Sequence, residues 1–229
     1  GAPFFAEHLA RYHFASDLVK SKRVLELACG KGYGCSILAE TATSIVGIDL
    51  NEESLVFAQK YYGRSNVEFK KCDVTKLDQL TGQFDAIVAF ELIEHLPPAA
   101  TASFLSEIKA KLSSSGICLI STPNHNVVLK SGMPVPDFHI NNFEAHALQD
   151  LLHQYFNMVE MYGQVLSRGR LLDFIYWADM GQIRHSSLLK TIRSGFANFP
   201  RSKTSSVLTS AAPSSDKKVW SMSQGWGES

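Results

Sequence analysis

A glycine-rich break in an apolar stretch constrains the fold of this chain more than any other feature. Residues 23–40 read RVLELACGKGYGCSILAE, in which an apolar run of strand length leads to Gly30, Gly32 and Gly34 and then to apolar residues at helical spacing. Glycine lets the backbone approach a ligand where a Cβ would collide, and the first turn of a helix attracts anionic groups. The stretch predicts a strand, a turn and a helix that bind a nucleotide-like ligand. A tight turn without a ligand is the alternative that the glycines alone leave open.

Acidic residues follow the next three apolar runs of strand length. They are Asp49, Asp73 and Glu91, after the runs at 44–48, 66–71 and 84–90. Ligands of open α/β sheets bind in the crevice at the carboxyl ends of the strands, so these carboxylates are expected beside the glycine turn. Asp49 stands about twenty residues after the glycines, where a carboxylate reaches ribose hydroxyls. Helix capping is the alternative for Asp49 and Asp73, because Asp often precedes a helix.

Composition indicates a globular chain without a general affinity for nucleic acid. Hydrophobic residues make up 45% of the 229 residues and charged ones 19%, which is enough to bury a core. The 22 basic and 22 acidic residues cancel, so the basic excess that accompanies general nucleic-acid binding is missing.

Neither a membrane span nor a secretory signal is visible in the sequence, which predicts a cytoplasmic protein. The cysteines lack the paired C-x-x-C spacing of zinc sites, and we expect free, buried thiols in a reducing compartment. They are Cys29, Cys35, Cys72 and Cys118.

The motif set resembles the class I S-adenosylmethionine-dependent methyltransferases. The first motif of that family has the form E/D-x-x-x-G-x-G-x-G, and residues 26–34 match it in full. The resemblance covers residues 8–164. A closer similarity is to bacterial methyltransferases associated with surface-polysaccharide biosynthesis, with related patterns in ubiquinone-pathway O-methyltransferases and small-RNA 2′-O-methyltransferases. That similarity rests on the stretches at 7–12, 90–96, 121–124, 138–143 and 162–164.

The expected fold is α/β, with a Rossmann-like, seven-stranded, mostly parallel sheet and helices on both faces. The last strand is expected to pair antiparallel with the strand at 157–165, and a helical insertion between the two would cap the site. We expect a single domain in four parts. They are an N-terminal helix or cap at 1–22 whose polar residues are solvated, a cofactor-binding core at 23–165, a helical insertion and mobile loop at 166–216, and the last strand and tail at 217–229.

The resemblance implies that the cofactor is S-adenosylmethionine and that S-adenosylhomocysteine is its product. Glu26 would hold the methionine amino group, and the glycine turn with its helix N-terminus would hold the carboxylate. Asp49 would bind the ribose hydroxyls, while Asp73 and the backbone of Val74 would read adenine. The full set of expected cofactor residues is Glu26, Ala28, Gly30, Gly32, Asp49, Leu50, Asp73, Val74, Phe90 and Glu91.

Methyl transfer is a direct displacement at carbon, so the protein must align the acceptor, and a positioned base can remove the acceptor's proton. The candidate catalytic residues are His95, His139 and Glu94. His125, after the strand that ends at residue 121, is a spare candidate for the base.

Three interpretations of these residues stay open. In the first, His95 or His139 is a base that needs no metal. In the second, Glu91, Glu94, His95 and His139 hold a divalent metal, as the resemblance to small-RNA methyltransferases implies, with the first three sharing one face if residues 91–96 are helical. In the third, His95 is structural.

The preferred acceptor is an oxygen of a sugar or glycan precursor, and a small phenolic or quinone-pathway acceptor is the alternative. A non-catalytic cofactor-binding or assembly subunit is the hypothesis from another class. Five arginines of the expected insertion form either a solvated face or a basic rim that holds an acidic acceptor or contacts an anionic membrane peripherally. They are Arg168, Arg170, Arg184, Arg193 and Arg201. The sequence does not predict an oligomeric state.

Overall fold

The structure is a computed structural model that describes residues 2–130, 132, 134–164 and 218–224. Leu9–Leu166 and Ser215–Ser229 form one compact unit, and Gly1–His8 with Ser167–Ser214 form a second. The prediction of a single domain stays a prediction. The elements are α1 (Ala2–Leu18), β1 (Arg23–Leu27), α2 (Tyr33–Leu38), β2 (Ser44–Asp49), α3 (Glu52–Tyr62), β3 (Val67–Lys71), η1 (Leu77–Gln79), β4 (Phe84–Phe90), η2 (Ile93–His95), α4 (Pro98–Lys111), β5 (Leu112–Thr122), α5 (His125–Lys130), α6 (Ala145–His153), β6 (Met158–Gln164) and β7 (Lys218–Gln224).

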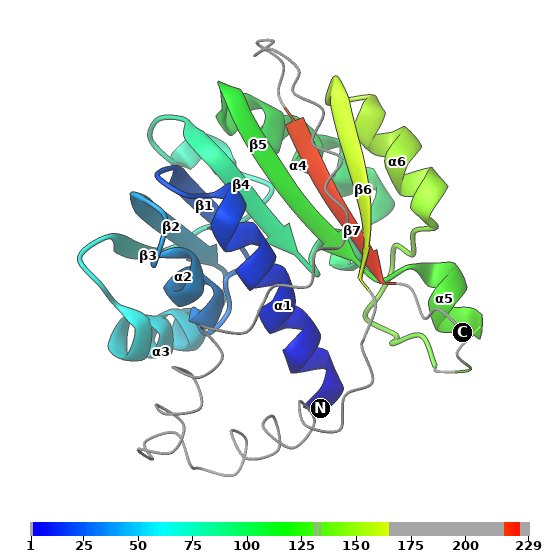
Figure 1. The fold of residues 1–229 in the computed structure, drawn as a ribbon, viewed down its shortest axis with the longest axis horizontal. Coiled ribbons are helices and arrows are strands. Elements are labelled where there is room, and N and C mark those ends of the chain that lie inside the picture. The colour runs from blue at the N-terminus through cyan, green and yellow to red at the C-terminus, as the bar shows by residue number, and fades with distance from the viewer. Residues whose placement is uncertain (1, 131, 133, 165–217, 225–229) are drawn as a thin grey trace, which may run out of the picture. The chain divides into compact units, whose positions relative to one another are not determined.

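The strands form a sheet in the order β3-β2-β1-β4-β5-β7-β6 (Figure 1). Successive strands step outward from β1 through β2 to β3, and the chain then returns to the other side of β1 with β4. The winding direction therefore reverses at the carboxyl ends of β1 and β4, which is where ligands of open α/β sheets bind. The predicted Rossmann-like α/β fold is confirmed.

The predicted direction of the last strand was wrong. β7 lies between β5 and β6 and runs parallel to both, with Val219 opposite Cys118 on one side and Val159 on the other. A parallel connection needs roughly a dozen residues or more, and residues 165–217 are long enough to make one. Alternating side chains show that a segment is a strand but not which way it runs. The expected helical insertion, its five arginines and the loop before β7 lie outside the described residues.

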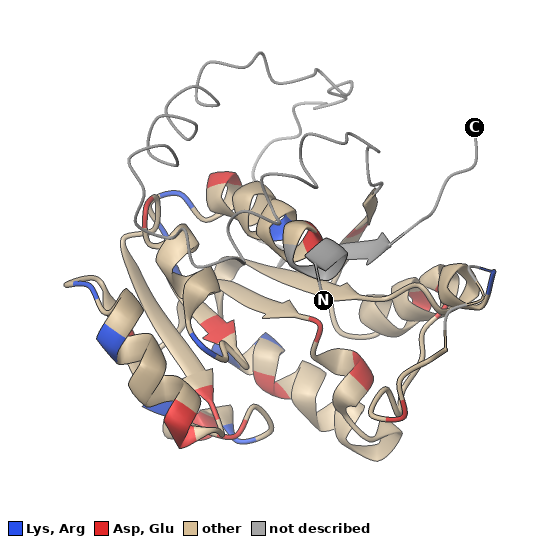
Figure 2. Cartoon of the chain, turned by 90° about the horizontal axis from the view of Figure 1, so that it is seen from below, with Lys and Arg blue, Asp and Glu red and all other residues tan. Residues whose placement is uncertain are grey.

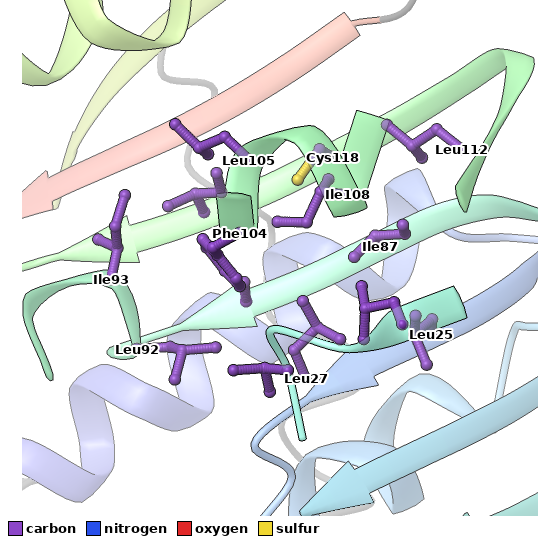
Figure 3. Packing of buried hydrophobic residues seen from close by; sticks show 14 of the residues in the cluster. Leu25, Leu27, Ile87, Leu92, Ile93, Phe104, Leu105, Ile108, Leu112 and Cys118 are labelled. Atoms are coloured by element: carbon purple, nitrogen blue, oxygen red, sulfur yellow. The ribbon is translucent and has the colours of Figure 1, made fainter. Parts of the chain in front are cut away.

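Each face of the sheet is covered by its own hydrophobic cluster, because successive residues of a buried parallel strand point to opposite faces. On one face Leu25, Leu27 and Ile87 pack against Phe104 and Ile108 of α4 (Figure 3). The other face is packed by Val24, Ala86 and Val88 against α1, α2 and α3. Full burial of each large side chain contributes about 1.5–3 kcal/mol. These clusters hold the strands, and so their carboxyl ends, in a fixed register.

Capping and proline residues in the sequence mark the starts of α3 and α4, as predicted. Asn51 caps α3 by accepting a hydrogen bond from the Ser54 N–H at 2.9 Å, and Pro97 precedes α4. The expected loop after β5 contains one further helix, α5. All four cysteines are free and buried, as predicted. Basic and acidic residues are interspersed over the described elements in Figure 2. No helix within the described ranges has the length and apolarity needed to cross a membrane.

Candidate active site

The glycine turn is built from residues in the left-handed backbone region. Gly30 has a φ of 54° and Gly32, the N-cap of α2, a φ of 80°. At Gly32 a Cβ would lie 2.6 Å from the Cβ of Ala58, so this glycine is required by packing. At Gly30 nothing lies within 4 Å of a Cβ. Only Gly30 therefore presents its backbone to open space, where a ligand can approach.

Two residues other than glycine adopt the same strained backbone at the ends of neighbouring strands. Ala28 after β1 has a φ of 53°, and Glu91 after β4 a φ of 50°. A left-handed conformation costs a side-chain-bearing residue roughly 1–2 kcal/mol. Glu91 is held in it because its N–H donates to the Ser121 carbonyl at 3.0 Å. Strained residues of this kind are common at functional sites. Here they follow β1 and β4, the two neighbouring strands between which the winding direction of the sheet reverses.

Asp49 ties the glycine turn to β2. Its carboxylate accepts hydrogen bonds from the Gly30 N–H and from the Asn51 N–H, both at 2.8 Å. Asn51, not Asp49, is the N-cap of α3, so simple helix capping does not explain this aspartate. A carboxylate offers about four lone-pair sites, which leaves capacity for ribose hydroxyls. Leu50, which was predicted to contact the cofactor, is 60% exposed beside it.

Asp73 combines the two roles that the sequence left open. Its Oδ1 accepts from the N–H and the hydroxyl of Thr75 at 2.9 and 2.8 Å, and these bonds hold the pKa of Asp73 below its ordinary value. One carboxylate oxygen therefore stabilises the turn, while Oδ2 has no partner among the described residues. The Val74 side chain is buried in the core, so only its backbone is available to a ligand.

Glu26 is a buried carboxyl with one unsatisfied oxygen. It is 1% exposed, and the Tyr12 hydroxyl donates to Oε1 at 2.6 Å. Oε2 has no hydrogen-bond partner within the described part of the chain. Burial raises the pKa of Glu26 to about 7, against the neighbouring Cys35 thiol and the Tyr12 hydroxyl, which lower it. Phe90, also predicted here, packs edge-on against the Tyr12 ring with centroids 5.2 Å apart.

The helix α1 supplies site residues that the sequence analysis missed. Arg11 is 1% exposed, and its Nη1 lies 2.6 Å from Oε1 of Glu91. The same Nη1 donates to the Ser121 hydroxyl at 3.2 Å, and that hydroxyl donates to Glu91 at 2.9 Å. The expectation that polar residues of this helix are solvated was wrong for Arg11. Arg11 shares a helix face with the buried Ala15 at i+4, a spacing that could have indicated its burial.

The predicted catalytic residues lie together. One oxygen of Glu94 and one nitrogen each of His95 and His139 lie within 4.8 Å of one another. The two imidazole rings are 4.9 Å apart and nearly perpendicular. The main chain of Asn141 donates to the Glu94 carbonyl at 3.0 Å, which holds the loop with His139 against η2.

Glu91 does not belong to this cluster, contrary to the four-residue metal hypothesis. Helical spacing across residues 91–96 was assumed, but η2 covers only Ile93–His95. Glu91 lies before it in a left-handed conformation, which breaks the helical repeat. Its carboxylate pairs with Arg11 instead. The donors that remain together are one carboxyl and two imidazoles, a set that can still coordinate a divalent cation.

Burial favours the uncharged forms of two members of this cluster, Glu94 and His139. Burial, and then the neighbouring Glu91, raise the pKa of Glu94 to about 8, and neither of its oxygens has a hydrogen-bond partner among the described residues. Partial burial, and then His95, lower the pKa of His139. Nδ1 of His95 lies 3.1 Å from the Phe138 carbonyl, which can only accept, so Nδ1 is the donor in this contact. His125, the spare candidate, begins α5 and is not in the group of three.

Comparisons with known proteins identify the family of this chain. A family model described as a methyltransferase domain matches residues 5–160, more than half of the chain. The chain belongs to the class I S-adenosylmethionine-dependent methyltransferases. A probable S-adenosylmethionine-dependent methyltransferase of Mycolicibacterium smegmatis is 30% identical over 151 residues, which are 65% of this chain and 57% of that protein. The chain thus spans little more than half the length of this relative.

A second curated relative and a solved structure are also similar to this chain. A ubiquinone biosynthesis O-methyltransferase of Psychrobacter cryohalolentis is 30% identical over 133 residues, 52% of this chain and 51% of that protein. Among solved structures, the N-methyltransferase NodS from Bradyrhizobium japonicum in complex with S-adenosylhomocysteine superposes with a TM-score of 0.57 at 17% identity. That match covers 69% of this chain and 78% of NodS. At that identity the likeness shows the shared fold alone.

Proposed function

We propose that this methyltransferase transfers a methyl group from S-adenosylmethionine to a hydroxyl oxygen of a small acceptor. The observation that carries the proposal is the placement of acids with remaining acceptor capacity at the strand ends around an open glycine turn, together with the cluster of Glu94, His95 and His139 after β4. Glu26 Oε2 suits the methionine ammonium, Gly30 is open to the methionine carboxylate, and Asp49 with Asp73 suits the adenosine. Bound there, the cofactor supplies an activated methyl group.

His139 provides a base for the acceptor proton. Because the pKa of His139 is lowered, its imidazole favours the neutral form and can accept a proton at neutral pH. Glu94, with its raised pKa, stays protonated and can donate a hydrogen bond to the acceptor. A positioned base of this kind contributes roughly 10²–10⁴-fold to the rate.

The proton affinity of this base favours a phenolic acceptor. A phenol has a pKa of about 10, whereas an aliphatic hydroxyl lies nearer to the value of about 15.7 for water. The pKa of an imidazole is much closer to that of a phenol than to that of an aliphatic alcohol, so proton transfer from the phenol is easier. The surroundings agree, because Phe138 and Ile140, on both sides of His139, are 65% and 52% exposed and offer an apolar rim. The similarity to ubiquinone biosynthesis O-methyltransferases points to the same class.

A sugar or glycan hydroxyl, which the sequence analysis preferred, is a second candidate that requires a metal. The donor cluster of Glu94, His95 and His139 is the specific observation in its favour. A divalent cation held there would lower the pKa of the bound hydroxyl enough for ionisation near neutral pH. Without a cation the described residues offer no base strong enough for such an alcohol.

The test is methyl transfer to catechol and phenol acceptors and to a panel of sugars, each with chelator and with Mg²⁺ or Mn²⁺. Turnover of phenols in chelator, lost by about 10²-fold or more in His139→Ala, supports the first proposal. The matched control is His146→Ala, because His146 is exposed on α6. If only sugars are methylated, and only when metal is present, the phenol proposal is wrong and the sugar proposal is supported. Binding of S-adenosylhomocysteine without turnover of any acceptor would favour a non-catalytic subunit.

A further inference from the structure

Two adjacent residues of α1 reach acids on different strands, and Tyr12 is the more confined of the pair. Arg11 pairs with Glu91 after β4, and Tyr12 donates to Glu26 in β1 at 2.6 Å. The Tyr12 ring packs edge-on against Tyr33 and Phe90, with centroids 5.4 and 5.2 Å away. The position of the Tyr12 hydroxyl is therefore set by rings on two sides.

The glycine motif leaves room for this tyrosine. A Cβ on Gly34 would lie 2.3 Å from two carbons of the Tyr12 ring and 2.4 Å from Oε1 of Glu26. The third glycine of the motif is thus needed at the meeting point of Tyr12 and Glu26, and not at the open side of the turn. The tyrosine, the glycine and the glutamate fit together as one packed unit.

Tyr12 fixes Oε1 of Glu26, and Oε2 has no hydrogen-bond partner among the residues that the structure describes. The titratable groups that act on Glu26 are the Tyr12 hydroxyl from α1 and the Cys35 thiol from α2, while Tyr33 and Cys29 act on those two in turn. None of these groups is cationic. A buried carboxyl in such surroundings favours its protonated form until a cation reaches the free oxygen.

We propose that Tyr12 is a positioning residue that aims Oε2 of Glu26 at the ammonium of the cofactor's methionine end, and that Glu26 releases a proton to solvent when that ammonium binds. The O–H bond of the carboxyl breaks, and no bond to the cofactor forms. This inference rests on the proposed function, since it takes the methionine end to lie at Glu26.

The direction of the linkage follows from the groups around Glu26. Burial places the pKa of Glu26 at about 7, so most of the carboxyl is protonated at pH 6.5 and almost none at pH 8.5. An adjacent ammonium favours the ionised form and lowers that pKa. The Tyr12 hydroxyl also lowers it. Loss of the hydroxyl therefore moves the titration of Glu26 to higher pH.

The experiment is calorimetric titration with S-adenosylhomocysteine in buffers of different ionisation enthalpy, which counts the protons released. We expect wild type to release roughly 0.5–0.8 proton at pH 6.5 and close to none at pH 8.5, as a pKa of about 7 requires. Glu26→Gln is expected to bind more weakly and to lose this release. Tyr12→Phe keeps the ring and is expected to bind about tenfold more weakly, the scale of one hydrogen bond, with its proton release extended to higher pH.

Tyr61→Phe is the matched control, because Tyr61 is 59% exposed on α3. Circular dichroism of each variant verifies folding, and proton counts in Glu26→Gln test the linkage independently if Tyr12→Phe does not fold. Binding by wild type without proton release at pH 6.5, or unchanged affinity and proton count in Tyr12→Phe, would overturn the inference and leave the proposed function standing. Absence of any binding to wild type would instead overturn the proposed function.

Discussion

Replacing Gly30 by alanine tests whether the open side of the turn faces the cofactor. The added Cβ meets no atom within 4 Å, so its structural cost is the strain of a φ of 54° alone. That strain amounts to roughly 1–2 kcal/mol of unfolding free energy. A ligand lying against the Gly30 backbone would have to move away from the methyl group. We expect the affinity for S-adenosylhomocysteine to fall at least about tenfold, or about 1.4 kcal/mol.

Gly32→Ala is the matched comparison, because its obstacle is the protein itself. Its φ of 80° adds the same strain, and the Cβ would lie 2.6 Å from Ala58 and 2.8 Å from the Phe69 ring. Overpacking adds about 1–3 kcal/mol, so the total loss of stability is about 2–5 kcal/mol. Urea denaturation and calorimetric titration measure both quantities. A folded Gly30→Ala that binds within twofold of wild type would refute the placement of the ligand at this turn.

Three further predictions concern single side chains. Asp49→Ala removes an acceptor from the Gly30 N–H and from the expected ribose, so S-adenosylhomocysteine should bind at least about fivefold more weakly by calorimetry; unchanged affinity would contradict its role. Arg11→Met leaves Glu91, itself 17% exposed, without its cation and should cost about 3 kcal/mol in urea unfolding, while a loss below about 1 kcal/mol would show that the pair is not structural. Because the folded-state pKa of Glu94 is raised from 4.5 to about 8, this carboxyl makes the fold progressively less stable as pH rises between those values. Glu94→Gln should therefore gain stability over wild type on the order of several kcal/mol at pH 8 but not at pH 4.5, and an equal difference at both would contradict the shift.

The positions of the acids at the sheet edge could be predicted because strand ends are locally encoded. An apolar run fixes where each strand lies, and a parallel sheet brings every carboxyl end to one edge. Asp49 and Asp73 could therefore be placed before any coordinates were known. Their hydrogen bonds could not, because the partners of Asp73 and Asp49 depend on the turn conformations that follow each strand.

The cluster of Glu94, His95 and His139 was predicted less completely because it depends on contacts between distant segments. His95 and His139 are brought together by a loop that Asn141 fastens to η2, and sequence spacing does not encode that contact. Glu91 was misplaced because helical periodicity was extended to a residue whose backbone is left-handed. Arg11 and Tyr12 lie on a helix whose apolar pattern indicates burial but not which acids it reaches.

The most direct measurement is a crystal structure of the protein with S-adenosylhomocysteine bound. We predict that its ammonium lies within hydrogen-bonding distance of Oε2 of Glu26, its carboxylate near Gly30, and its ribose hydroxyls at Asp49. A ligand bound away from the carboxyl ends of β1 and β2, or bound with Glu26 still lacking a partner, would contradict the central claim that these strand ends hold the methyl donor.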